Sequence, residues 1–178
     1  MMQLRQFNDE VLYAVDPVVR VGRTDISELI QRVEHVARKR ARICAHRDVA
    51  DKLHEMLIVH TRDTYVRPHK HLGKSESFHL IEGAADVVVL DDQGNIADVI
   101  TMGDYSSGKT FYYRMADPLY HTLLIRSEVI VFHEVTNGPF DRSDTLFAPW
   151  APEDGAPSRK QFMERLAIDV ASFRSRKS

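Results

Sequence analysis

The chain lacks most features of secreted and membrane-spanning proteins. Its 178 residues include a single cysteine, Cys44, which excludes an internal disulfide and is typical of a reducing compartment. No apolar run approaches the length needed to span a bilayer. The N-terminal stretch carries a charge every few residues and lacks the apolar core of a secretory signal. We therefore expect a cytoplasmic protein that does not interact with a membrane.

The chain also lacks an excess of either charge. Its 24 basic and 26 acidic residues give a net charge of −2, so nothing indicates binding to nucleic acid. The densest basic cluster, residues 38–42, lies within a helical pattern, which favours a solvated face. The composition, 43% apolar and 28% charged, is that of a folded globular protein, and the length suits one domain.

Two helical patterns enclose a β-rich region. Apolar residues at intervals of three to four predict a helix at about 25–43, with Thr24 or Asp25 as its cap. Between residues 55 and 136, roughly eight short runs separated by turn residues predict a β-sandwich or barrel. We expect one structural domain: an N-terminal segment at 1–54, the barrel at 55–136, and at 137–178 an irregular loop with a C-terminal helix packed on the barrel.

The stretch "RPHKHLGKSESFHLIEG", residues 67–83, contains a candidate metal site. Alternate side chains of a strand share a face, so His69 and His71 project together. Glu76 begins the next run and can return as a carboxylate ligand, after which a turn at Gly83 lets the sheet reverse. Such nitrogen and oxygen ligands suit Fe, Mn, Zn, Ni or Co rather than Ca or Mg. The alternative is a pair of histidines that face solvent on an edge strand.

A further histidine strengthens the metal interpretation. His121 lies within the apolar run "YHTLLI", where an imidazole without a partner would be costly to bury. It therefore needs a partner, and a metal is one candidate.

The spacing of these residues resembles the first motif of the cupin superfamily, in which H-x-H, four residues, E, six residues and G follow one another. His69, His71, Glu76 and Gly83 match it position by position, and His121 matches the histidine of the second cupin motif. The chain departs from the pattern at three places. Asp63 replaces the opening glycine of the first motif, "DPLY" replaces Pro-x-Gly, and Ile125 replaces the asparagine of the second. The resemblance implies a mainly β fold, the double-stranded β-helix or jelly-roll barrel, with one divalent transition metal per chain.

The resemblance extends to the WbuC-type cupin-fold metalloproteins over roughly residues 10–155. It rests on the segments "KRARICAH", "HEMLIVHTRDTYVRPHKHLGKSESFHLIEG", "FYYRM", "YHTLL", "VFHEVTNGPF" and "FAPWAP". That family is associated with bacterial O-antigen and surface-polysaccharide gene clusters, and it has no settled reaction. Cupins commonly pair by exchanging N-terminal strands, so the resemblance also implies a homodimer.

Two strands supply candidates for catalysis. In "FYYRM" one of Tyr112 and Tyr113 faces the barrel, where its hydroxyl could bind a sugar or a metal-bound oxygen. We predict Tyr113 as a catalytic residue and Tyr112 as a substrate-binding one; the alternative is that both are plain aromatics of the β core. His133 and Glu134 likewise point to opposite faces. The one that faces inward is a candidate acid or base, and we predict Glu134.

Four further residues are candidates for substrate binding. Arg67 shares the predicted ligand face of His69 and could hold an anionic group, or could form a salt bridge with a strand neighbour. His60 could line the barrel or end its strand at solvent. Arg42 and His46 could reach the barrel mouth and hold an anionic group. Alternatively, they belong to a strand that adds to the sheet or to a partner subunit.

Three functions are compatible with these residues. The first is a metal-dependent enzyme, isomerase-like or epimerase-like, acting on a small polar substrate such as a sugar or sugar nucleotide. The second is a non-catalytic protein that binds a small molecule, anionic or sugar-like, through its metal. The third is an Fe(II)-type dioxygenase. Three histidines and one carboxylate leave open coordination positions, which all three functions require.

Overall fold

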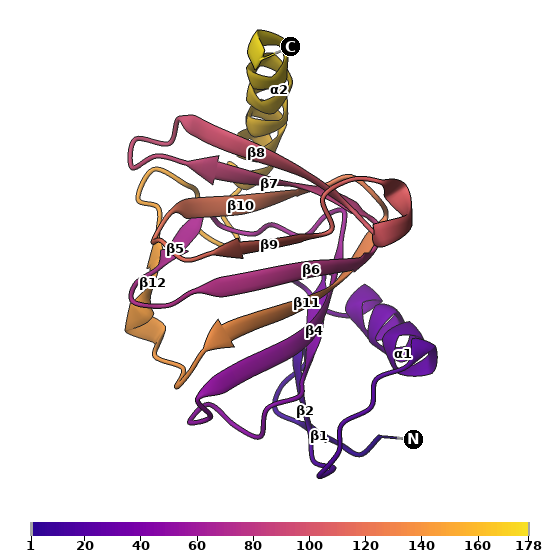
Figure 1. The fold of residues 1–178 in the computed structure, drawn as a ribbon. Coiled ribbons are helices and arrows are strands. Elements are labelled where there is room, and N and C mark those ends of the chain that lie inside the picture. The colour runs from indigo at the N-terminus through magenta and orange to yellow at the C-terminus, as the bar shows by residue number, and fades with distance from the viewer. Residues whose placement is uncertain (1, 178) are drawn as a thin grey trace.

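Two β-sheets face one another in the computed structural model, which describes residues 2–177 (Figure 1). The larger sheet has seven strands, in the spatial order β1 (Leu4–Gln6), β2 (Val11–Ala14), β3 (Arg40–Cys44), β4 (Leu53–Thr61), β11 (Val129–Asn137), β6 (Glu76–Glu82) and β9 (Tyr112–Met115). The smaller sheet has five, in the order β12 (Thr145–Phe147), β5 (His69–His71), β10 (Tyr120–Ile125), β7 (Ala84–Leu90) and β8 (Ile96–Gly103). The strand pairs are antiparallel, apart from the parallel pair of β2 and β3. This arrangement is the predicted jelly-roll barrel.

The core lies between the two sheets because alternate residues of each strand point inward. Its largest fully buried side chains are Phe78, Leu80, Met102, Ile130 and Phe132. Two short 3-10 helices, η1 (Tyr105–Ser107) and η2 (Arg142–Asp144), lie in the connections.

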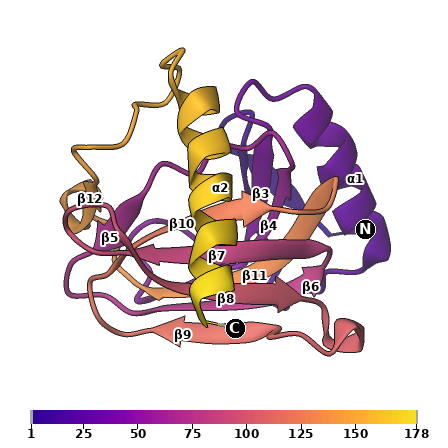
Figure 2. The same ribbon diagram turned by 90° about the horizontal axis from the view of Figure 1, so that it is seen from above.

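Each sheet is covered on its outer face by one helix. Helix α1 (Arg23–Glu34) packs Leu29 and Val33 against the larger sheet. Helix α2 (Arg159–Lys177) runs across the smaller sheet (Figure 2) and buries Leu166 and Val170 there, with Phe162 half-buried beside them. The stripe predicted for the C-terminal helix is therefore confirmed. Among residues 2–177, no helix is both long and apolar enough to cross a membrane.

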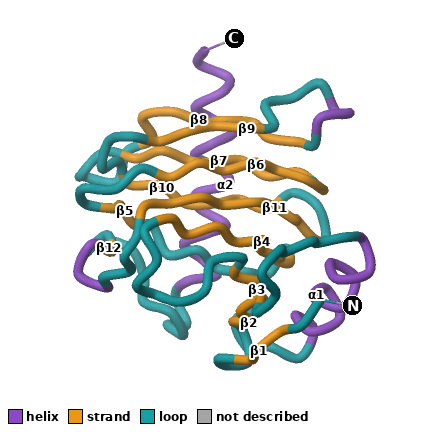
Figure 3. Tube along the Cα trace, turned by 60° about the horizontal axis from the view of Figure 1, so that its bottom comes forward, coloured by secondary structure: helices purple, strands orange, loops and turns teal. Residues whose placement is uncertain are grey.

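The N-terminal helix is shorter than the sequence predicts. It ends at Glu34 rather than at about residue 43, and the chain then turns through Lys39, which has a left-handed φ of 56°. Residues 40–44 form β3, which pairs with β4. The prediction of the helix end is wrong because Ala41 and Ile43 fit two patterns. They lie at the three-to-four spacing that continues the helical stripe, but they also alternate as residues of a strand, and in the structure this strand buries them under α1. Figure 3 shows β1, β2 and β3 continuing the larger sheet beyond β4, so the segment 1–54 supplies three strands of the barrel.

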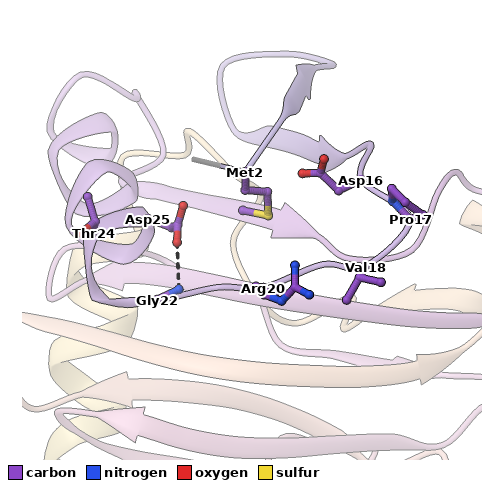
Figure 4. Close-up of a pocket in the computed structure, with 8 residues that line it drawn as sticks. All are labelled: Met2, Asp16, Pro17, Val18, Arg20, Gly22, Thr24 and Asp25. Carbon is purple, nitrogen blue, oxygen red and sulfur yellow. Dashed lines mark hydrogen bonds between the residues drawn. The ribbon is translucent and has the colours of Figure 1, made fainter.

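The start of α1 also differs from the prediction. Gly22 is the N-cap residue, and neither Thr24 nor Asp25 occupies that position. The Asp25 carboxylate instead accepts a hydrogen bond of 2.8 Å from the Gly22 N–H (Figure 4). An acidic side chain in the first turn of a helix can accept a hydrogen bond from the backbone N–H of the N-cap residue. In a sequence, such a residue therefore indicates that the helix begins a few residues earlier.

The segment predicted as an irregular loop contains a strand. Thr145–Phe147 forms β12, which pairs with β5 next to the candidate metal site. Three residues are too few to show the alternation that identifies a strand in a sequence.

Gly83 is the corner at which the chain leaves β6 in the larger sheet and enters β7 in the smaller one. Its φ is +93°, and a β-carbon added there would overlap the carbonyl oxygen of Val129. We expect Gly83→Ala to lower the free energy of unfolding by about 1–3 kcal/mol, the usual cost of such backbone strain, measured by urea denaturation. Gly73→Ala is the matched control, because Gly73 also has a positive φ but faces open space. Equal losses in the two variants would contradict a specific clash at Gly83.

Candidate metal centre

Four side chains of metal-binding type converge inside the barrel. His69 and His71 project inward from β5, Glu76 from the start of β6, and His121 from β10. One ligand atom from each lies within 4.8 Å of the others. The antiparallel pairing of β10 with β5 places His121 directly opposite His69. Lys70 points outward instead, and its Nζ lies 2.7 Å from Asp92.

The three imidazole rings are each held by a hydrogen bond at Nδ1. The Nδ1 of His69 lies 2.8 Å from the carbonyl oxygen of Arg67, and that of His121 lies 3.0 Å from the carbonyl oxygen of Leu119. A carbonyl only accepts, so each of these nitrogens carries the proton and the Nε2 lone pair is free. The Nδ1 of His71 lies 3.2 Å from the hydroxyl of Thr145. Such outer hydrogen bonds are the usual means of orienting histidine ligands.

The Glu76 carboxylate is held with one oxygen toward the histidines. Its Oε1 accepts a hydrogen bond of 2.8 Å from the Tyr113 hydroxyl. Its Oε2 lies 3.4 Å from Nε2 of His71 and 3.5 Å from Nε2 of His121. The free Nε2 atoms and Oε2 therefore point at one another, as the ligands of a single ion would.

The electrostatics of the cluster favour an ionised Glu76 and a neutral His69, whereas the pKa of His121 is raised, because Glu76 outweighs the opposite effect of burial. Burial alone would raise the pKa of Glu76, but His121 and His71 outweigh it and hold this pKa well below its ordinary value. Burial, together with the neighbouring histidines, lowers the pKa of His69 to about 3. The site therefore offers an ionised carboxylate and a neutral imidazole at neutral pH. Three nitrogens and one oxygen match a divalent transition metal of the Fe, Mn, Co, Ni or Zn type.

Tyr113 faces the barrel, and Tyr112 faces out. Tyr113 is buried and bonded to Glu76, whereas Tyr112 is exposed on the opposite face of β9, where its hydroxyl donates to Ser77. The substrate-binding role predicted for Tyr112 is therefore not supported, since its side chain lies outside the barrel.

We expect Tyr113→Phe to weaken metal binding by about 10-fold, at the lower end of the effect of losing a residue that orients a ligand. The variant removes the hydroxyl that holds Glu76 and leaves the ring in place. Chelator-competition titration with Co(II) would measure the change. Tyr112→Phe is the control and should bind Co(II) as the wild type does; a similar loss in both variants would contradict a specific role for the Tyr113 hydroxyl.

Glu134 lies on the inner face of β11, and His133 on the outer face. The Nε2 of His133 lies 3.8 Å from the Glu55 carboxylate, outside the barrel. Burial, and then the charge of Glu76, raise the pKa of Glu134 to about 8, although Arg42 acts in the opposite direction. Glu134 therefore keeps its proton near neutral pH. The choice of Glu134 over His133 as the inward-facing residue agrees with the structure.

The candidates for substrate binding occupy different places. His60 is buried on the inner face against Phe132, so it lines the barrel and does not end its strand at solvent. Arg42 also faces the interior, since β3 adds to the larger sheet.

Arg67 packs over the Phe147 ring, 5.0 Å from its centroid, and donates to the carbonyl of Ala148 at 3.4 Å. Among residues 2–177 it forms no salt bridge with a strand neighbour.

His46 has a structural environment. Its ring stacks on His54 at a centroid distance of 4.1 Å, and its Nδ1 lies 3.1 Å from both the backbone nitrogen and the carbonyl oxygen of Glu55. The predicted substrate-binding role is therefore not supported, because the pairing of the strands places this nitrogen against the backbone.

Sequence reasoning missed the groups that orient the histidines. Two of them are backbone carbonyls, which no side-chain pattern can reveal. The third, Thr145, belongs to β12 in the segment predicted to be irregular, and only the short β-prone run "TLF" marks it.

A separate surface pocket of about 800 Å³ lies at the N-terminal segment (Figure 4). Met2 and residues of the stretch 16–25 line it, and none of the predicted site residues does. It is therefore distinct from the metal cluster in the barrel.

Comparisons with known proteins bear on the fold. The family described as a domain of unknown function (DUF6016) matches residues 21–102, and no curated protein matches the chain. Protein SO0799 from Shewanella oneidensis superposes with a TM-score of 0.52 at 10% identity, over 68% of this chain and 82% of that one. Oxalate decarboxylase from Bacillus subtilis gives TM-scores of 0.45 and 0.43 in two structures, at 19% and 18% identity, over 56% of this chain. The chain spans only about a quarter of the decarboxylase, matching 25% and 24% of its length. With the order of the strands, the likeness to SO0799 confirms the cupin fold predicted from the sequence.

Proposed function

We propose that the protein binds one divalent transition metal through His69, His71, Glu76 and His121, and that it is a metal-dependent enzyme acting on a small polar molecule. The observation that carries this proposal is the convergence of one carboxylate oxygen and three imidazoles inside a cupin barrel. The hydrogen bonds at Nδ1 of His69 and His121 support it, because their acceptors are carbonyl oxygens and the Nε2 atoms of these rings are left free.

The other inner residues suit catalysis as well as binding. A bound metal would supply Lewis-acid or redox chemistry at the open coordination positions. Tyr113 holds the Glu76 carboxylate in place. Glu134 retains a proton near neutral pH, so it can exchange that proton with a bound substrate.

The resemblance to WbuC-type cupins supports a sugar or sugar nucleotide as the substrate, within the synthesis of a surface polysaccharide. The same resemblance favours a homodimer, which light scattering of the purified protein would test.

The proposal is tested by loading the metal-free protein with Fe(II), Mn(II), Co(II), Ni(II) or Zn(II) and measuring the stoichiometry. One ion per chain is expected. Each loaded form is then incubated with a panel of nucleotide sugars, and the products are identified by mass spectrometry. Consumption of oxygen with the Fe(II) form would instead favour a dioxygenase. Tight binding of a panel member with no product in any loaded form would favour a binding protein without turnover.

A further inference from the structure

The inner face of the larger sheet carries a second group of polar side chains beyond the metal cluster. Arg42 of β3 lies opposite Ile58 of β4, and Ile58 belongs to the core between the sheets. Arg42 therefore projects to the inside of the barrel. Its side chain is half-buried, so it is accessible to a small molecule.

Arg42 has no anionic partner among residues 2–177. It forms no ion pair with a carboxylate there, and its Nε is buried without a hydrogen-bond partner. Its guanidinium does interact with the Cys44 thiol and with the nearby Glu134 carboxyl, whose pKa it lowers against the larger effect of burial. Arg40, two residues earlier, differs in this respect, since its guanidinium lies 3.4 Å from the Glu10 carboxylate and 3.9 Å from that of Asp154. A guanidinium stays charged, and a charge removed from water without a partner is costly. Because no carboxylate among residues 2–177 pairs with it directly, Arg42 can bind an anion that the chain does not itself supply.

His60 adds a second polar atom without a partner. It lies opposite Arg40 in the pairing of β3 with β4, on the same inner face as Arg42. Its side chain is only 7% exposed, and its Nδ1 has no hydrogen-bond partner. Burial lowers the pKa of His60 to about 3, with the charges of Arg40 and Arg42 acting in the same direction. The ring is therefore neutral, and its unpaired nitrogen can contribute a hydrogen bond to a ligand.

The metal cluster and Arg42 face the same interior. Glu134 lies opposite Phe78, two residues along β6 from Glu76, and also opposite Met56 of β4. Met56 in turn lies opposite Cys44, two residues along β3 from Arg42. The strand register therefore places Glu134 between the cluster and Arg42. Apolar side chains such as Met56 and Phe132 pack on the same inner face.

We infer that Arg42, with His60 beside it, binds a carboxylate group of the small molecule whose other end reaches the metal cluster. This inference rests on the proposed function, which it narrows to acidic substrates. Two parallel N–H groups of one guanidinium match the two oxygens of a carboxylate. A phosphate dianion carries two negative charges, and the single guanidinium of Arg42 would neutralise only one of them. The second charge would be removed from water without a partner, which is costly, so a carboxylate is favoured.

Binding of small diacids tests the inference. The probes are malonate, succinate and glutarate, each compared with its half-amide by calorimetry on Mn(II)-loaded protein. In the wild type we expect at least one diacid to bind at least 10-fold more tightly than its half-amide. Arg42→Gln should abolish that preference, and Arg42→Lys should retain part of it, since lysine keeps the charge but not the planar fork. Arg47→Gln is the control, because Arg47 is exposed and its hydrogen bonds, to Arg5 and Asp51, are made by its backbone rather than its side chain.

The outcomes separate this inference from the proposed function. Failure of the wild type to take up Mn(II) would contradict the proposed metal site. Normal uptake combined with an undiminished preference for diacids in Arg42→Gln would overturn the role of Arg42. The role of Arg42 would also be overturned if the wild-type protein bound no diacid more tightly than its half-amide. Tighter binding of phosphonoacetate than of malonate, lost in Arg42→Gln, would overturn the carboxylate assignment in favour of a phosphoryl group.

Discussion

Replacing His121 with alanine is expected to nearly abolish metal binding. Loss of a residue that only orients a ligand costs about 10- to 100-fold in metal affinity, so loss of a ligand atom should cost more than about 100-fold. His121 is buried opposite His69, and its Nε2 lies 3.5 Å from Glu76. Among residues 2–177 the cluster consists of His121, His69, His71 and Glu76, so loss of His121 leaves three ligands. Titration with Co(II) in competition with a chelator would measure the loss.

The control for His121→Ala is His79→Ala. His79 is exposed on the outer face of β6, so its removal should leave the affinity for Co(II) unchanged. If His121→Ala folds poorly, His71→Ala provides the same test at a half-buried position on a short strand. A second measurement is the thermal midpoint, because a metal at about 100 times its dissociation constant stabilises a protein by about 2.7 kcal/mol. Retention of that stabilisation in both ligand variants would contradict the proposed site.

Replacing Phe132 with alanine is expected to cause the largest loss of stability. Phe132 is 1% exposed, stacks on Phe78 at a centroid distance of 4.2 Å, and contacts the His60 ring edge-on at 5.1 Å. Truncating a buried phenylalanine to alanine usually costs about 3–5 kcal/mol, because the transfer energy is lost and a cavity remains. Urea denaturation of the metal-free protein would measure the free energy of unfolding.

Phe140→Ala is the matched control for this prediction. Phe140 is 55% exposed in the segment after β11, so the same truncation there leaves no internal cavity. Its effect should stay within about 1 kcal/mol, the centre of the range for point substitutions. Similar losses in the two variants would show that Phe132 is not a central element of the core.

Local patterns in the sequence predicted much of the fold and the metal ligands. The alternation of a strand puts His69 and His71 on one face, and this property does not depend on the rest of the chain. The stripe of α2 follows from the same kind of local geometry. Alternation also shows that the two residues of each adjacent pair, Tyr112 and Tyr113 or His133 and Glu134, face opposite sides, but it does not show which of them faces inward. The boundary of α1 was predicted wrongly, because residues 36–43 satisfy the helical and the strand period together.

The side of the sheet on which Arg42 lies could not be predicted in this way. Whether β3 joins the barrel, and which face it then presents, depends on its pairing with β4 rather than on its own residues. The same holds for Thr145, which reaches His71 only because β12 pairs with β5.

The sequence by itself predicted a β-sandwich or barrel between two helices and four residues that could hold a metal, because strand periodicity is a local property. The resemblance of the motif spacing to that of cupins implied the jelly-roll barrel. Only the tertiary structure decided which nitrogen of the His69 and His121 rings is free and that Tyr113 holds Glu76. It also decided that Arg42 faces the same interior as the cluster without a partner. Those features depend on contacts between strands that are distant in the chain, and such contacts are set by the pairing and packing of the whole barrel.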